Sequence, residues 1–332
     1  MTQPLVSIIV PTYNGEKHLA ATLESIINQD YENIEIIFVN DASTDNTLKI
    51  AENALKNSGR GYKIINHEKN SGVSAARNDG LDSADGEYVW FCDSDDRAEK
   101  NFVSSLYKKI EDKNADLVFC GIKDFYESEN IFKEEPITLK EKSLNPEFYF
   151  KAWATQKIKF WSVWNFIFKK SFVDKINLHF NEQCKLGEDT EFVLKALAAA
   201  DKISFVRENL YIYVHHENMT SVKYHHDKKI FESLALSRFR SIRPVIRRIN
   251  DKTVRSYAVN FYIADSVIDK LTYRAKAKDY KNYASIFKHK KVRELLFSTI
   301  KFLFKKPELF FKAFMLLYMP KLYYFSRKGT KN

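Results

Sequence analysis

The sequence has few cysteines, and their placement excludes two kinds of stabilisation. Cys92, Cys120 and Cys184 are the only 3 cysteines among 332 residues. They are odd in number, far apart and in no Cys-x-x-Cys pattern, so they indicate neither a disulfide framework nor a zinc site. This usage is typical of a protein that works in a reducing cytosol.

Glycine and proline are also scarce, at 9 and 7 residues. Long disordered linkers are therefore not expected, while a hydrophobic content of 45% with 14% aromatic residues is enough for a large core. Because the chain is longer than a usual single domain, we expect either one large domain with an appendage or two domains.

No apolar run is long enough to cross a membrane. The run Leu5–Val10 has no basic segment before it and no cleavage signature after it, so it predicts a first strand rather than a signal peptide. Lysines and one glutamate interrupt the apolar stretch 295–324, so a transmembrane helix is not expected there either.

Two glycine motifs that bind phosphate are missing as well. The first apolar run is not followed by Gly-x-Gly-x-x-Gly, and the chain contains no Gly-x-x-x-x-Gly-Lys-Ser/Thr. Both absences argue against a dinucleotide-dependent dehydrogenase and a P-loop nucleotidase. A phosphate ligand would have to be bound chiefly through a metal ion, with Arg77 as a helper.

Charge is distributed unevenly along the chain. Residues 2–221 hold 26 Lys and Arg against 35 Asp and Glu, whereas residues 222–332 hold 27 against 8. An acidic body thus precedes a strongly basic C-terminal part. Such a part is suited to nucleic acid, an anionic membrane or an acidic polymer.

Apolar and amphipathic segments alternate in the first third of the chain. Continuous apolar runs predict strands, and helical spacing predicts helices between them. The strands are expected at Leu5–Val10, Ile34–Asn40, Tyr62–Asn66, Tyr88–Cys92 and Asp116–Gly121, and helices at His18–Gln29, Thr47–Lys56 and Asn101–Asn114. This order predicts an α/β fold with a doubly wound sheet.

Polar clusters follow each of the first four strands. They are Thr12–Asn14, Asp41–Thr47, Asn70–Asn78 and Asp93–Asp96. Each cluster taken alone fits ordinary turn chemistry. Ligands of such sheets bind at the carboxyl ends of the strands, so the four clusters together predict a binding site along one edge.

The carboxylates after the fourth strand are the most specific of these signals. Asp93 and Asp95 are two positions apart and Asp96 follows, so their charges repel unless a cation lies among them. Their oxygen ligands suit Mg²⁺ or Mn²⁺ and leave coordination positions for substrate phosphates. The alternative is a solvated acidic turn.

Three later segments carry similar ambiguity. The aromatic-rich stretch Phe148–Phe172 fits either core or a surface on which sugar rings stack. Glu188 and Asp189 precede a helical pattern, where acids also favour the positive end of the helix dipole. His215 and His216 lie where a strand breaks into a polar turn, and one of them is a candidate metal ligand.

With these segments in place, the chain resembles the family 2 glycosyltransferases, bacterial inverting enzymes of the GT-A fold. The likeness covers about residues 5–221 and depends on the order of several short motifs. They are Val10-Pro-Thr-Tyr-Asn14, Val39-Asn-Asp41-Ala-Ser-Thr-Asp45, Asn70-x-Gly72-x-x-x-Ala76-Arg77-Asn78, Asp93-Ser-Asp95-Asp96, Val163-Trp-Asn165, Gly187-Glu-Asp189 and the turn 211–221. The resemblance implies a mixed, mainly parallel sheet with helices on both faces.

The resemblance also implies roles for individual residues. It assigns Asp189 as general base with Glu188 in support, Asp93, Asp95 and His216 to the metal, and Trp164 and Asn165 to the acceptor. The nucleotide would contact Pro11, Thr12, Tyr13, Asn14, Glu35, Asp41, Asn70, Arg77, Asp93 and Ser94. Val214, Met219 and Phe166 depart from residues that are frequent in the family, which affects the diphosphate and acceptor contacts.

The activity so implied is Mn²⁺- or Mg²⁺-dependent, inverting transfer of a hexose or N-acetylhexosamine from a UDP-sugar. The acceptor would be a saccharide, free or lipid-linked, in capsule, exopolysaccharide or lipopolysaccharide synthesis. Residues 1–221 would form the catalytic domain, with a nucleotide-sugar half to about residue 97 and an acceptor half from 98. A nucleotidyltransferase is an alternative, but it would carry a Gly-rich, basic loop after the first strand.

The basic residues 222–332 are expected to be helical. Arginines at helical spacing and alternating lysine and aromatic residues predict helices on an anionic membrane surface, at the cytoplasmic face of the bacterial cell membrane. The alternative is an ordinary helical subdomain packed on the catalytic body. A non-enzymatic polyanion-binding protein would explain these basic residues, but an acidic rim repels nucleic acid, which is not expected as a partner.

Overall fold

The computed structural model of the chain describes most of the first 217 residues and a part of the C-terminal third. The described residues are 3–154, 158, 162–184, 187–217, 247, 284, 293, 312, 314–316 and 318–327. Within these ranges no helix is both long and apolar enough to cross a membrane. The boundary predicted near residue 221 and nearly all of residues 222–332 lie outside the described ranges.

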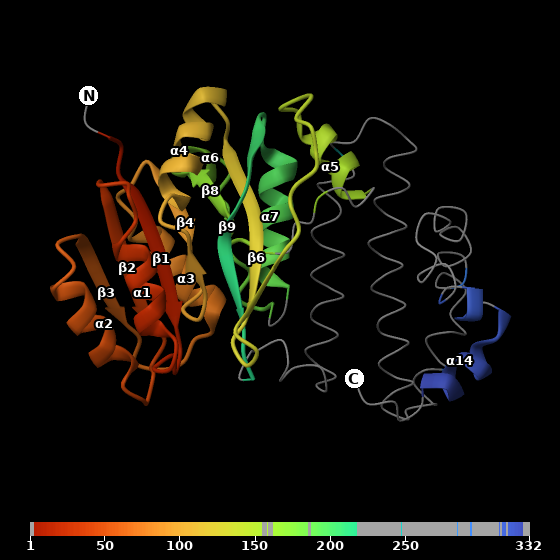
Figure 1. The fold of residues 1–332 in the computed structure, drawn as a ribbon, viewed down its shortest axis with the longest axis horizontal. Coiled ribbons are helices and arrows are strands. Elements are labelled where there is room, and N and C mark those ends of the chain that lie inside the picture. The colour runs from red at the N-terminus through yellow and green to blue at the C-terminus, as the bar shows by residue number, and fades with distance from the viewer. Residues whose placement is uncertain are drawn as a thin grey trace.

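Strands and helices alternate through the first half of the chain (Figure 1). The strands are β1 Val6–Thr12, β2 Ile34–Asn40, β3 Gly61–Asn66, β4 Tyr88–Phe91, β5 Arg97–Ala98, β6 Leu117–Tyr126, β7 Ile131–Glu134, β8 Phe166–Lys169 and β9 Ile203–His215. The helices are α1 Leu19–Ile27, α2 Thr47–Lys56, α3 Val73–Asp82, α4 Phe102–Lys113, α5 Pro146–Ala154, α6 Lys170–Lys175, α7 Glu188–Ala199 and α14 Pro320–Arg327.

These strands form one mixed sheet in the order β3-β2-β1-β4-β8-β6-β9-β5, with β7 paired to β6. Strands β3, β2, β1 and β4 run parallel, as do β6 and β9. Strand β8 lies antiparallel between β4 and β6 and so joins the two parallel groups. The carboxyl ends of β1, β2 and β4 therefore lie at one edge.

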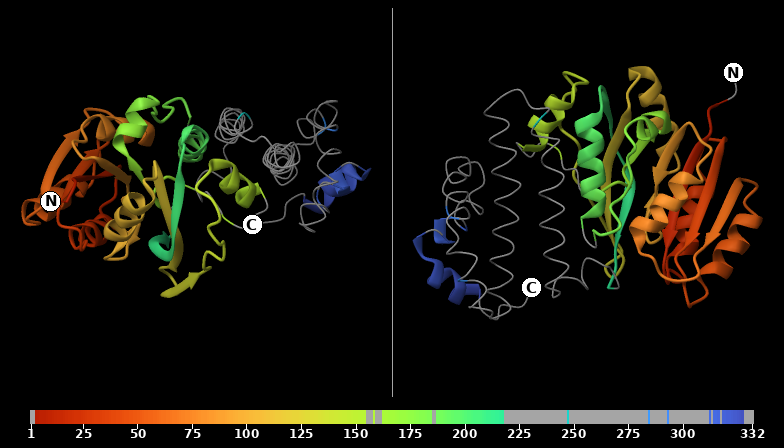
Figure 2. Two further views of the ribbon diagram at one scale, coloured as in Figure 1. Left: turned by 90° about the horizontal axis from the view of Figure 1, so that it is seen from above. Right: turned by 180° about the vertical axis from the view of Figure 1, so that it is seen from behind.

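Side chains alternate between two faces of the sheet, and helices cover both (Figure 2). Ile8 and Val10 of β1 pack with residues of α1, α2 and α4, whereas Ile9 packs with residues of α3 and α7. A strand that is buried on both faces needs apolar residues at every position, which explains the continuous run in β1. The predicted α/β fold with helices on both faces is confirmed.

Several predicted bounds match the structure, and others fall short. Strand β2 and helix α2 have the predicted ends, whereas β6 continues five residues past Gly121 to Tyr126. Strand β9 starts at Ile203, eight residues before Tyr211, where the sequence predicts the strand that breaks into the polar turn. The last residues of the two strands, 122–126 of β6 and 211–215 of β9, pair with each other and are only partly buried. Polar residues therefore interrupt the apolar pattern there.

Candidate active site

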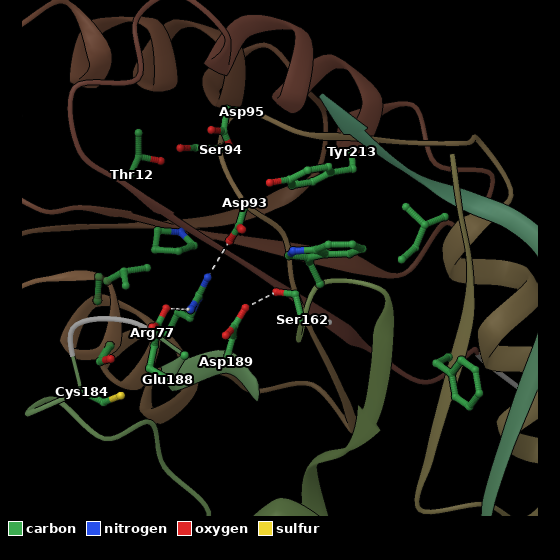
Figure 3. Close-up of a pocket in the computed structure, with 18 of the residues that line it drawn as sticks. Thr12, Arg77, Asp93, Ser94, Asp95, Ser162, Cys184, Glu188, Asp189 and Tyr213 are labelled. Carbon is green, nitrogen blue, oxygen red and sulfur yellow. Dashed lines mark hydrogen bonds and ion pairs between the residues drawn. The ribbon is translucent and has the colours of Figure 1, made fainter. Parts of the chain in front are cut away.

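A cavity of about 1440 Å³ opens at the carboxyl ends of β1, β2 and β4 (Figure 3). Its other walls come from the start of α3, from β6, from the segment before β8 and from the start of α7. Most of the residues that the sequence places in a binding site line it. They are Pro11, Thr12, Tyr13, Asp41, Asn70, Arg77, Asp93, Ser94, Asp95, Trp164, Glu188 and Asp189.

Arg77 lies at the centre of the polar wall and contacts both sides of it. Its Nη2 donates to Asp93 Oδ1 at 2.7 Å, and its Nη1 donates to Glu188 Oε1 at 3.2 Å. Burial opposes the charge, but Asp93 and Glu188 outweigh burial and raise the pKa of the guanidinium. Arg77 is thus a buried, permanent cation that links the end of β4 to the start of α7 (Figure 3).

Glu188 and Asp189 start α7 and differ in their surroundings. Burial raises the pKa of Glu188 to about 7, and the neighbouring Asp189 adds to the rise while Arg77 opposes it. Asp189 Oδ2 accepts from the Ser162 hydroxyl at 2.6 Å, and Oδ1 accepts from the Thr190 backbone N–H at 2.6 Å. Both contacts fix the Asp189 carboxylate at the cavity wall, and Figure 3 shows the one with Ser162.

The three carboxylates after β4 point to different partners. Asp93 faces Arg77, and burial raises its pKa although Arg77 opposes the rise. Asp96 is 1% exposed and accepts from the Tyr211 hydroxyl and the Val214 N–H, both at 2.8 Å. Burial raises the pKa of Asp96 well above its ordinary value. Asp96 therefore fastens β9, and only Asp93 and Asp95 line the cavity.

Asp95 and His216 are the pair best suited to a cation. His216 Nε2 lies 3.1 Å from Asp95 Oδ2, close to the distance of about 3 Å that separates neighbouring ligands of octahedral Mg²⁺. Within the described ranges no three His, Cys, Asp or Glu side chains form a metal cluster. Because Asp93 is bound to Arg77, the residues fit a cation with two protein ligands and open positions for phosphate oxygens.

Asp41 is held by the start of α3. Its two carboxylate oxygens accept from the Ser71 N–H at 2.7 Å and the Gly72 N–H at 2.8 Å, and His67 Nδ1 lies 2.8 Å away. Gly72 has a φ of +90°, which a residue with a side chain rarely adopts. His67 lies in no sequence motif that would mark it for the site.

Four predicted site residues do not line the cavity, and His216, which lies behind Asp95, is one of them. Glu35 lies near the amino end of β2, where it accepts from the Ser7 hydroxyl at 2.5 Å and the Asp85 N–H at 2.8 Å, so its predicted place beside the nucleoside does not match. Asn14 is exposed, and its side chain accepts from the Thr44 N–H. Asn165 is buried, donates to the Cys120 carbonyl oxygen and joins the end of β8 to β6.

The structure also adds wall residues that sequence patterns did not indicate. Ser162, Phe119, Tyr213 and the segment Glu135–Thr138 line the cavity. Phe119 and Tyr213 lie on strands that read as core, and residues 135–138 have no recognisable motif. Only the neighbouring Trp-Asn motif gave an indirect signal for Ser162.

A sheet of this topology, with paired carboxylates after β4 and further carboxylates across the cavity, defines the GT-A class of nucleotide-sugar-binding folds. Residues 7–176 match the family described as Glycosyl transferase family 2. The chain belongs to this family.

Known relatives agree with that assignment. The chain is 32% identical over 223 residues to the uncharacterized glycosyltransferase EpsJ of Bacillus subtilis (strain 168), which covers 67% of this chain and 64% of EpsJ. The aligned part thus spans less than two thirds of that relative.

Solved structures share the fold. A crystal structure of Staphylococcus aureus TarS 1-349 in complex with UDP-GlcNAc has a TM-score of 0.64 at 21% identity, over 98% of this chain and 90% of that chain. The mannosyltransferase PcManGT of Pyrobaculum calidifontis, in complex with GDP-Man and Mn²⁺, has a TM-score of 0.55 at 17% identity, over 96% and 88%.

Proposed function

We propose that this protein is an inverting glycosyltransferase that transfers a hexose or N-acetylhexosamine from a UDP-sugar to a saccharide. The observation that carries the proposal is the meeting of Asp93 and Asp95 with Glu188 and Asp189 in one cavity, although about a hundred residues separate the pairs. Arg77 pairs with Asp93 and with Glu188, so it holds the carboxylates proposed to face the donor at a fixed distance from those proposed to face the acceptor. The UDP-GlcNAc in the TarS complex supports a UDP-linked donor.

In this proposal Asp189 is the general base. It takes the proton from an acceptor hydroxyl, whose oxygen forms a bond to the anomeric carbon of the donor sugar. The bond from that carbon to the diphosphate oxygen breaks on the opposite face, which inverts the configuration. Ser162 and the Thr190 N–H hold the carboxylate in place, and this positioning makes it effective as a base.

Asp95 and His216 would hold a Mn²⁺ or Mg²⁺ ion, with Asp93 beside it. Such an ion supplies positive charge next to the departing nucleoside diphosphate. The Mn²⁺ in the PcManGT complex supports a divalent ion for this fold. Arg77 adds a second positive charge on the same wall.

The acceptor would enter between β6 and the segment before β8. Trp164 lines this end of the cavity and stacks on Tyr213, with ring centroids 5.5 Å apart and planes 16° apart. Aromatic faces of this kind suit the apolar faces of sugar rings. We further propose that the acceptor is lipid-linked and that the protein works as a peripheral protein on the cytoplasmic membrane face, in cell-surface polysaccharide synthesis.

Replacing Asp189 by asparagine tests the base. Asparagine keeps the shape and can still accept from the Thr190 N–H, but it cannot take a proton, so we expect transfer to fall by at least about a hundredfold. Donor affinity, measured by calorimetry with UDP and Mn²⁺, should stay within a factor of about three. Sugar transfer at the wild-type rate in Asp189→Asn would refute the assignment.

A further inference from the structure

His18 stacks on His216, the histidine that pairs with Asp95. The ring centroids are 4.1 Å apart and the planes differ by 27°. The side chains are 15% and 6% exposed, so the stack is largely shielded from water. His18 is the residue before α1, and nothing in its sequence context marks it for the site.

The far edge of the His18 ring faces the turn between β6 and β7. His18 Nδ1 lies 3.6 Å from Glu127 Oε1, and the Glu127 N–H donates to the His215 carbonyl oxygen at 3.1 Å. Three separate segments, the start of α1, the turn after β6 and the end of β9, therefore meet around one imidazole stack. Contacts from two sides restrict the rotation of both rings.

The first turn of α1 also holds the loop that carries Asp95. The Thr22 hydroxyl donates to the Ser94 carbonyl oxygen at 2.9 Å, and Thr22 is fully buried. The same helical turn thus contacts the Asp95 loop through Thr22 and the His216 ring through His18. These two contacts set the spacing between Asp95 and His216.

We propose that His18 is a positioning residue that fixes the His216 imidazole beside Asp95, so that the two side chains are ready to hold a divalent cation. This inference rests on the cation site of the proposed function and adds the start of α1 to it. A ligand that is already oriented loses less conformational entropy on binding, and residues that orient metal ligands typically change metal affinity by about 10- to 100-fold.

The test is Mn²⁺ affinity of the full chain with saturating UDP, measured from the electron paramagnetic resonance signal of free Mn²⁺. We expect His18→Ala to weaken Mn²⁺ binding by about tenfold or more, and His18→Phe, which keeps a flat ring for stacking, to stay within about threefold of wild type. UDP affinity without metal should be unchanged in both. Thermal unfolding establishes that each variant is folded.

Two further variants serve as controls for the Mn²⁺ affinity of His18→Ala. His179 is a surface residue that does not line the cavity, and its Nε2 lies 3.0 Å from Asp82 Oδ1. His179→Ala should therefore keep wild-type Mn²⁺ affinity. If His216→Ala weakens Mn²⁺ binding but His18→Ala does not, the positioning role is wrong while the cation site stands. If His216→Ala has no effect, the cation site itself is wrong, and the positioning role falls with it.

Discussion

The buried charges of the cavity wall form one connected group. Arg77 is 3% exposed and shares its two terminal nitrogens between Asp93 and Glu188. Removing one partner of a buried charge cluster leaves the others uncompensated, which costs more than the pair contributes. Within this group Glu188 is the side chain whose charge changes near neutral pH, because burial raises its pKa to about 7.

This pKa makes stability depend on pH in a defined direction. The ordinary glutamate pKa is 4.5, so between this value and about 7 the folded protein holds a proton that the unfolded chain has lost. The free energy of unfolding of the wild type therefore falls as pH rises through this range. Glu188→Gln has no proton to lose, so its stability relative to wild type should rise by about 1 to 3 kcal/mol from about pH 5 to about pH 8.

Urea unfolding at several pH values measures this difference. The pairing with Arg77 is already part of the Glu188 pKa, so its loss belongs to the pH-dependent change, whereas the other effects of the glutamine side chain add an offset that does not change with pH. A stability difference that stays constant across the range would contradict the prediction.

For single residues, the sequence predicted which side chains belong to the site better than it predicted what those side chains contact. Asp95 and Asp189 carry recognisable motifs, and both line the cavity. Glu35 was placed beside the nucleoside by the resemblance alone, although the predicted strand Ile34–Asn40 already puts it at the amino end, away from the cavity. Ser162 and His18 were not identified because their partners, Asp189 and His216, are 27 and 198 positions away.

At the scale of the elements, helix α3 packs closely on the sheet at Gly80. Gly80 of this helix faces β1, and a Cβ at this position would overlap Ile9 Cγ2 and lie 3.3 Å from Val39 Cγ2. Glycine in a helix interior costs about 1 kcal/mol relative to alanine, so local propensity alone would favour a replacement. At this position close packing outweighs helix propensity. The absence of a side chain at Gly80 lets α3, which carries Arg77, lie against β1.

We therefore expect Gly80→Ala to destabilise the protein by about 1 to 3 kcal/mol, because overpacking outweighs helix propensity. Displacement of α3 should also move Arg77 and weaken UDP binding. Gly61→Ala is the matched control, since a Cβ there makes only ordinary contacts at 3.8 Å and the residue lies on an edge strand. Denaturant unfolding and UDP calorimetry separate the two effects, and a more stable Gly80→Ala would show that propensity wins.

The type and order of these elements were predictable, because a buried parallel strand and an amphipathic helix have different periods. The place of β8 was not predictable. Its four residues Phe166–Lys169 lie within an aromatic stretch and pair with β4 and β6, which precede it by about 80 and 50 residues. Local patterns do not encode such pairings.

For the whole molecule, the basic C-terminal residues remain the main feature that the cavity does not explain. Residues 301–332 hold 8 Lys and Arg against one Glu. On the described part of this segment Tyr318, Met319 and Leu322 are 58%, 45% and 55% exposed, and Lys321 is exposed beside them. Exposed apolar and cationic side chains next to one another at the start of α14 suit an anionic bilayer.

A pair of substitutions tests this membrane proposal. Tyr318→Glu with Leu322→Glu should reduce cosedimentation with vesicles containing about one third phosphatidylserine by about tenfold or more, since two apolar contacts are lost and two charges of the wrong sign are added. Ile131→Glu, at an exposed apolar residue of β7, should leave binding unchanged. Equal binding by the double variant and wild type would exclude this surface.

The antiparallel strand between the two parallel groups has a consequence for protein engineering. Because β8 follows residue 97 in the chain but pairs directly with β4, the part that we propose to hold the nucleotide cannot be exchanged between homologues by a single cut near residue 97. Asp96 strengthens this dependence, since its buried carboxylate has its partners on β9. Chimeras that alter donor choice should instead graft the loops after β1, β2 and β4 onto an intact sheet.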